Sequence, residues 1–96
     1  MSSVQWLAHN LSLPLDGVHS LLEHTEDPDK AAANLVESLS STEFLAMLRC
    51  RHARLDHSIG EGATILDVLL VIAGESVTNQ KAKLRFVIRQ LQEVRH

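Results

Sequence analysis

Residues 78–94, TNQKAKLRFVIRQLQEV, carry the clearest helical pattern in the chain. Apolar side chains recur along this segment at Leu84, Val87, Ile88, Leu91 and Val94. Spacings of three and four residues place them on one face of a helix, and that face must pack against other apolar surfaces. The segment therefore predicts a helix, capped by Thr78, that packs on a core made by the rest of the chain.

The N-terminal part of the chain predicts three more helices. The first is capped by Ser3 and ended by Pro14, and the second is capped by Asp16. In the third, Asp27 is the cap and Pro28 takes the first helical position, which needs no N–H. Each helix carries leucine, valine or alanine at helical spacing, so each offers one face to a common core.

A fourth helix is expected at residues 44–58, FLAMLRCRHARLDHS. Ser40 and Glu43 precede it with the spacing of a capping box, in which a hydroxyl and a carboxylate satisfy free N–H groups. Residues 60–62, GEG, indicate a flexible break after this helix.

Residues 65–73, ILDVLLVIA, are ambiguous between a helix and a buried strand. Helix is favoured because no other stretch offers a partner strand. Thr64 and Asp67 repeat the capping spacing before this segment, and Gly74 is expected to end it in a left-handed conformation.

The chain length of 96 residues and the apolar content of 45% fit one globular domain. Aromatic residues make up 3% of the chain, so the core must be largely aliphatic. Trp6 lies just off the apolar stripe of the first helix and is expected at the edge of the core rather than exposed. We predict an all-α fold, a compact bundle of about six short helices, with residues 1–96 as a single helical domain.

The longest apolar run, residues 65–73, contains an aspartate and is too short to span a bilayer, so no membrane partner is expected. Cys50 is the one cysteine and cannot form an internal disulfide. No apolar signal segment is visible at the N-terminus. These features favour a reducing, cytoplasmic location.

The net charge of −3 conceals a division along the chain. Residues 16–43 hold seven acidic side chains and one lysine, whereas residues 81–96 hold five basic side chains and one glutamate. Two interpretations are open. The acidic and basic segments face each other within the fold, or the basic residues contact another macromolecule.

Six basic residues form the candidate partner-binding site: Arg49, Arg51, Arg54, Lys81, Arg85 and Arg89. Arginine presents a rigid fork of donors that suits carboxylates at interfaces, which indicates a protein partner with an acidic surface. The sequence thus predicts a non-catalytic protein-interaction module, such as an adaptor, a regulator or a small chaperone-like partner. Residues 65–72 and the last helix carry more apolar surface than one small core can cover, which favours a homo-oligomer such as a homodimer.

The alternative is a nucleic-acid-binding transcriptional regulator that uses the basic last helix. Its predicted exposed face comprises Gln80, Lys81, Lys83, Arg85, Arg89 and Gln92. A sequence pI near 6.0 disfavours this interpretation, because carboxylates near a phosphate oppose binding.

No catalytic, metal or cofactor site is predicted. The pair His19 and His24 and the pair His52 and His57 are each five residues apart, whereas a helical metal pair needs three or four. Residues 60–64, GEGAT, lack the lysine and the spacing of a phosphate-binding loop. Cys50 has no histidine placed to act as its base, so the chain is not expected to be an enzyme.

Two short stretches resemble known families. Residues 44–56 resemble the closing helix of death-effector domains through Phe44, Leu45, Leu48, Arg51, Arg54 and Asp56. His57 replaces that family's final leucine, and about 40 residues follow where the family's domain would end. Residues 4–24 resemble the Trp…Gly…Leu-Leu spacing in the N-terminal armadillo-like region of formins. Both resemblances imply helical modules that bind proteins, and neither assigns a functional residue here.

Overall fold

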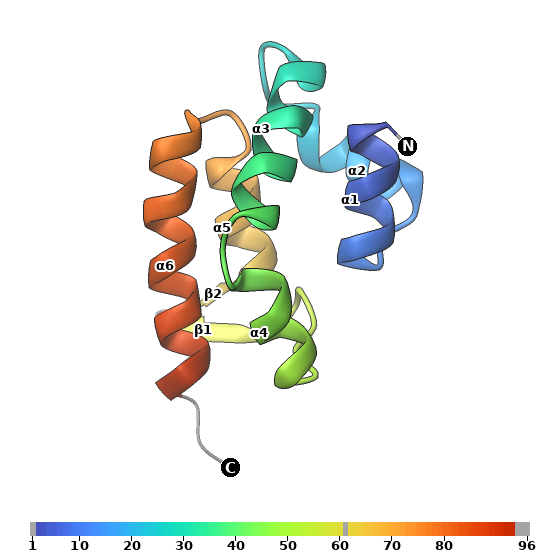
Figure 1. Ribbon diagram of the computed structural model, residues 1–96. Helices are drawn as coiled ribbons and strands as arrows, with labels where there is room; N and C mark the ends of the chain where they lie inside the picture. Colours follow the sequence, from blue (N-terminus) through green and yellow to red (C-terminus); the bar gives the residue numbers. More distant parts are fainter. Residues whose placement is uncertain (1, 61, 94–96) are drawn as a thin grey trace.

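The computed structural model describes residues 2–60 and 62–93 and has the predicted all-α architecture (Figure 1). Within these residues six helices and one short antiparallel hairpin follow one another. The elements are α1 Ser3–Leu11, α2 Leu15–Leu22, α3 Pro28–Ser40, α4 Phe44–Cys50, β1 Ser58–Gly60, β2 Ala63–Thr64, α5 Ile65–Ile72 and α6 Val77–Glu93. Val94, which the sequence pattern placed on the last helix, lies outside the described residues.

Helix α3 runs through the middle of the molecule and contacts α1, α2, α4 and α6 (Figure 1). Helix α6 forms one flank and packs on α3, α4 and α5. The core between these helices is aliphatic, as expected, with one buried aromatic ring. Its largest fully buried apolar side chains are Phe44, Leu7, Leu21, Leu22, Leu35, Leu39, Ile65, Leu69, Ile72 and Leu84. None of the helices in the described part of the chain has the length and apolar character that a membrane span requires.

Two predicted helix starts are confirmed. Asp27 caps α3 by accepting from the Lys30 N–H, with Pro28 in the first turn. Thr64 and Asp67 form the reciprocal capping box of α5, with N···O distances of 3.2 and 2.9 Å. Residues 65–72 are therefore a helix rather than a buried strand, because the box satisfies N–H groups that only a helix start leaves free.

Two predicted caps are wrong by one or two residues. Helix α1 is capped by Ser2 rather than Ser3, because Ser2 has Gln5 three residues later to complete the box. Helix α6 begins at Val77, and the hydroxyl of Ser76, not Thr78, accepts from a first-turn N–H.

The boundaries around the first loop also differ from expectation. Helix α1 ends at Leu11, before Pro14, because Ser12 adopts a left-handed conformation with φ 55°. Pro14 is the cap residue of α2, and Asp16 lies inside its first turn. A carboxylate there interacts favourably with the positive end of the helix dipole, so Asp16 still supports this helix start.

The predicted Ser40–Glu43 capping box is absent. Helix α3 continues to Ser40, and the Ser40 hydroxyl donates back to the Glu37 carbonyl. Ser41 and Thr42 also donate their hydroxyls to carbonyls of the last turn of α3. These hydroxyls therefore close α3, and the Thr42 hydroxyl also accepts from the N–H of Phe44 at the start of α4.

Helix α4 is much shorter than the predicted 44–58 segment and ends at Cys50. His52 turns the chain with a positive φ of 52°, and the chain then enters a hairpin in which Ser58 pairs with Thr64. The hairpin was not predicted. Gly60 and Gly62 flank its turn at φ 105° and 76°, a region that favours glycine. Residue 61 of the predicted break lies outside the described residues.

Gly74 does not end α5 as predicted, since it has no positive φ and Ala73 is the right-handed cap residue. Gln80, a fully buried side chain of α6, instead donates to carbonyls at the end of α5 and in the loop that follows, and the Ile72 carbonyl also accepts from the Glu75 N–H. Its Nε2 donates to the carbonyls of Ile72 at 3.0 Å and Glu75 at 3.1 Å. Its Oε1 accepts from the Ser38 hydroxyl of α3 at 2.6 Å, so one amide joins three helices.

We expect Gln80→Ala to destabilise the fold by about 3 kcal/mol. The substitution removes the partner of the buried Ser38 hydroxyl and of the Glu75 carbonyl, whereas the Ile72 carbonyl keeps the Glu75 N–H. Buried groups left without partners cost about 1–3 kcal/mol each. Urea unfolding followed by circular dichroism measures the change. Gln92→Ala, at an exposed site on the same helix, is the control and should change the free energy of unfolding by less than about 0.5 kcal/mol. Equal midpoints for the two variants would contradict the assignment.

Candidate functional site

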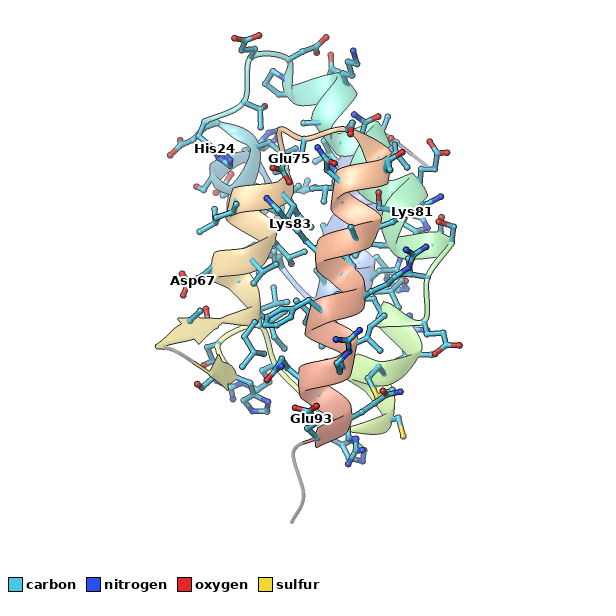
Figure 2. The ribbon with its side chains drawn as sticks, turned by 90° about the vertical axis from the view of Figure 1, so that its left-hand side faces the viewer. His24, Asp67, Glu75, Lys81, Lys83 and Glu93 are labelled. Atoms are coloured by element: carbon cyan, nitrogen blue, oxygen red, sulfur yellow. The ribbon has the colours of Figure 1, made fainter. Side chains whose placement is uncertain are left out.

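An apolar groove lies between α5 and α6 (Figure 2). It encloses about 410 Å³ and is lined by Ala63, Asp67, Val68, Val71, Ala82, Lys83 and Phe86. Helix α5 reads ILDVLLVI, so nearly every position is apolar. Because the core buries Ile65, Leu69 and Ile72, the outer side of the same short helix is also apolar.

Two large side chains of the groove are unusually exposed. Val71 is 64% exposed and Phe86 is 50% exposed. Full burial of a valine or phenylalanine side chain contributes about 1.5–3 kcal/mol, so this groove leaves a substantial part of that free energy unused. We call Val68, Val71, Ala82 and Phe86 the groove residues.

Charged side chains of opposite sign stand at the two ends of the groove. At one end the Asp67 carboxylate accepts from the Thr64 N–H in the capping box. At the other end Lys83 donates to Glu75 Oε1 at 2.6 Å. Figure 2 shows Lys83 between α6 and α5, with Asp67 further along the outer side of α5. The groove therefore has an apolar centre, and of the two charged side chains that line it Lys83 is already paired with Glu75.

The three arginines around Cys50 are exposed, and each has a contact within the chain. Arg49 donates to the Asn10 side chain at 3.0 Å, and Arg51 reaches the Gln92 carbonyl at 3.4 Å. Arg54 forms an ion pair with Asp56 at 3.0 Å. Asp56 lies outside the acidic segment 16–43, so this local pair occupies Arg54 but does not show the acidic and basic segments facing each other.

The six predicted partner-binding residues do not form one patch. Arg49 and Arg54 line a hollow of about 880 Å³ between the end of α1 and the loop after α4. Lys81, Arg85 and Arg89 follow one another at four-residue intervals, on one side of α6. Among the described residues, these three have no hydrogen-bond or ion-pair partner. Arg51 reaches α6 one turn beyond Arg89.

The predicted nucleic-acid face of α6 is partly wrong. Gln80 is fully buried and holds α5, as described above. Lys83 points to the opposite side of α6 from Lys81 (Figure 2) and is paired with Glu75. The remaining members of that face are Lys81, Arg85, Arg89 and Gln92, so its charge is smaller than the sequence suggested.

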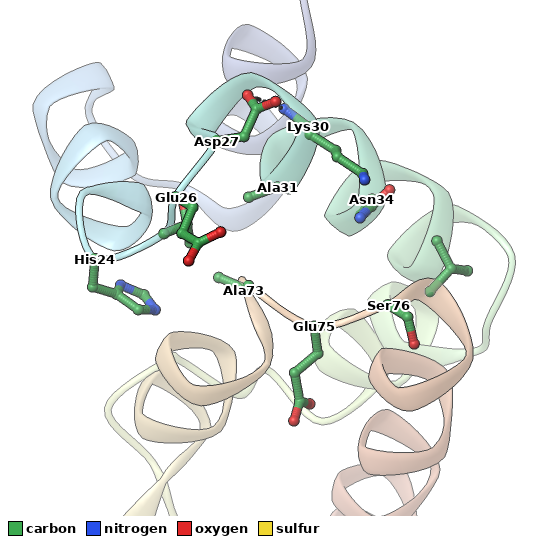
Figure 3. A pocket seen from close by; sticks show the side chains of 12 residues that line it. His24, Glu26, Asp27, Lys30, Ala31, Asn34, Ala73, Glu75 and Ser76 are labelled. Atoms are coloured by element: carbon green, nitrogen blue, oxygen red, sulfur yellow. Dashed lines mark hydrogen bonds between the residues drawn. The ribbon is translucent and has the colours of Figure 1, made fainter.

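A third hollow, of about 840 Å³, lies between the α2–α3 loop, the start of α3 and the α5–α6 loop (Figure 3). His24, Glu26 and Lys30 border it, so it carries charges of both signs. Glu75 also borders it, but its side chain points between α5 and α6, where Oε2 is buried without a hydrogen-bond partner. Among residues 2–60 and 62–93, no three histidine, cysteine or acidic side chains are grouped to hold a metal ion.

Cys50 is exposed at the end of α4, and the following turn carries His52 in its left-handed conformation. Trp6 is partly buried and packs on the core, which confirms the expected place at its edge.

The groove residues were missed as a site. Their signal was the apolar run of α5, interrupted only by Asp67, from which excess apolar surface, though no particular face, was predicted.

Comparison with protein-family models, with curated proteins and with solved structures finds no match to this chain.

The Arg54 guanidinium, which donates a hydrogen bond to Asp56, holds the pKa of that carboxyl below the usual 3.8. Because the folded pKa is lowered, the stabilisation is present above the unfolded pKa and is lost as pH falls through the folded value. We expect Arg54→Gln to raise the Asp56 pKa toward 3.8, as measured by carboxyl ¹³C NMR titration. Arg85→Gln is the control. An unchanged Asp56 midpoint in Arg54→Gln would show that the pair does not persist in solution.

Proposed function

We propose that this chain is a non-catalytic protein-interaction module that docks through the groove between α5 and α6. The observation that carries the proposal is the exposure of Val71 and Phe86, 64% and 50%, on two adjoining helices. A protein partner that covers these side chains gains the hydrophobic free energy that the isolated chain forgoes. Aromatic side chains near the centre of an interface commonly contribute most of the binding free energy.

The groove is suited to binding because its walls are fixed. Helix α5 is held at its start by the Thr64–Asp67 box and at its end by Gln80. Helix α6 packs on three other helices. A partner therefore loses little free energy in ordering the surface that it meets. These features suit an adaptor, a regulator or a small chaperone-like partner.

The basic residues of α6 supply the second part of the proposal. Lys81, Arg85 and Arg89 have no hydrogen-bond or ion-pair partner within the described chain, so their charge is available to an acidic surface. Such charges act mainly on orientation and association rate, whereas the apolar contact sets the lifetime of the complex. Arg49, Arg51 and Arg54 remain in the proposed site as flanking charges, and Arg54 contributes least because Asp56 already neutralises it.

Self-association and a cytoplasmic location are also part of the proposal. Self-association was predicted from the excess apolar surface of residues 65–72 and of the last helix. The exposed groove lies on these two segments, which supports this part of the proposal. The exposed thiol of Cys50 supports a reducing compartment, where such a group persists unoxidised.

We expect Phe86→Ser to weaken capture of protein partners about 30-fold, equivalent to about 2 kcal/mol, because the substitution removes the largest side chain of the groove. The immobilised chain is incubated with an extract of the cells that make it, and retained proteins are quantified by mass spectrometry. Leu15→Ser is the matched control, because Leu15 is 49% exposed but lies on α2. Equal retention by the two variants would refute the groove as the docking site.

The nucleic-acid alternative is favoured by one observation, the row of three unpaired cations on α6. Under the proposal, the wild type shows no measurable binding to duplex DNA at about 10 mM salt, where phosphate attraction is strongest. Fluorescence anisotropy with a labelled duplex measures this. Binding that Lys81/Arg85/Arg89→Gln abolishes and the charge-matched Arg49/Arg51/Arg54→Gln retains would replace the proposal with the alternative.

A further inference from the structure

We infer that the hollow between the end of α1 and the loop after α4 binds a small aliphatic carboxylate. The hollow encloses about 880 Å³, within the roughly 300–1,000 Å³ of small-molecule sites in proteins. It shares no lining residue with the α5–α6 groove, so this inference adds a site to the proposed function. Two observations carry it: the leucines that line the hollow, and the charge of Arg49, which has no acidic partner among the described residues.

Leucine side chains supply the apolar part of the hollow. Five of its lining residues are leucines: Leu11, Leu13, Leu48, Leu55 and Leu66. Leu11 and Leu48 belong to the buried core, whereas the other three pack against the core and stay partly exposed. An aliphatic chain that covers these leucines removes both its own surface and theirs from water, which is favourable.

Arg49 supplies the group that selects an anion. Its Nη2 donates to Asn10 Oδ1 at 3.0 Å, and Asn10 Nδ2 donates in turn to the Trp6 carbonyl at 2.9 Å. The Asn10 amide is thus oriented by α1, and it holds the guanidinium of α4 at the edge of the hollow that both residues line. The amide is neutral, and a guanidinium carries five N–H donors and a permanent positive charge. The charge and the remaining donors are therefore available to a carboxylate.

The other ionised groups that line the hollow cancel one another. Asp56 is the one acidic side chain among the lining residues, and it pairs with Arg54 at 3.0 Å. The positive charge that is left belongs to Arg49 and matches a ligand with a single negative charge, whereas a polyanion would also meet Asp56. His9 and His52 add imidazole groups that can donate hydrogen bonds to the same ligand.

The position of Arg49 in the last turn of α4 also gives it a favourable interaction with the helix dipole. That interaction needs only the charge and does not use the remaining N–H donors. The fixed amide and the adjoining leucines are the features that a role in helix stability leaves unexplained.

Titration of the full chain with octanoate, followed by ¹H–¹⁵N NMR, tests the site. We expect the N–H signals of Leu13 and Leu55 to shift, and binding to tighten at least about tenfold from butanoate to octanoate, because four more CH₂ groups leave water. Octanol has an aliphatic chain without the charge and should bind at least about tenfold more weakly than octanoate. Equal binding of octanoate and octanol would overturn the inference, and so would shifts confined to the surroundings of Val71 and Phe86.

Arg49→Gln tests the group that recognises the carboxylate. We expect this variant to bind octanoate at least about tenfold more weakly than the wild type, because a charge-assisted hydrogen bond is lost. Lys30→Gln makes the same change of charge at a residue that does not line the hollow, so it is the control and should bind as the wild type does. Circular dichroism of both variants checks that the helices are intact. Equal affinity of the two variants for octanoate would overturn the inference.

Discussion

The hydrogen bonds of Gln80 determine how the second half of the chain is arranged. A primary amide has two donors and an acceptor that takes two bonds, and in a fully buried position these groups need partners. Gln80 finds them in the last carbonyls of α5 and in the hydroxyl of Ser38, the other fully buried polar side chain among the described residues. Without this amide, the buried Ser38 hydroxyl would lose its partner, and the Ile72 carbonyl would keep only the Glu75 N–H.

The same bonds explain how so short a helix can present apolar side chains outward. An eight-residue helix is unstable alone in water, and on the outer side of α5 Val71 remains 64% exposed. A capping box at one end and the Gln80 amide at the other compensate, and the buried side carries Ile65, Leu69 and Ile72. Helix α5 is thus fixed at both ends and along its buried side. Its outer side stays exposed and forms one wall of the groove.

The sequence predicted the helices well, because apolar periodicity reports directly which residues face a core. It predicted boundaries less well, since adjacent hydroxyls such as Ser2 and Ser3 compete for one cap and only the partner at Gln5 decides. Periodicity continued past Cys50 although the chain turns there, because the turn depends on a left-handed residue, His52. Gln80 was misplaced because a glutamine among lysines usually lies at the surface. The exposure of Phe86 depends on which helix covers which face, and a single-helix pattern contains no information about that.

Helix α6 follows the other five helices in the chain, yet it forms one wall of the core for α3, α4 and α5. The bond between Ser38 and Gln80 joins residues 42 positions apart. On the ribosome, the leucines of α3 therefore stay without their final covering until residues beyond Gln80 have left the exit tunnel. The nascent chain therefore cannot complete its core before α6 has emerged. A product terminated before Val77 would expose the aliphatic side chains that α6 covers, and chaperones and proteases would act on it.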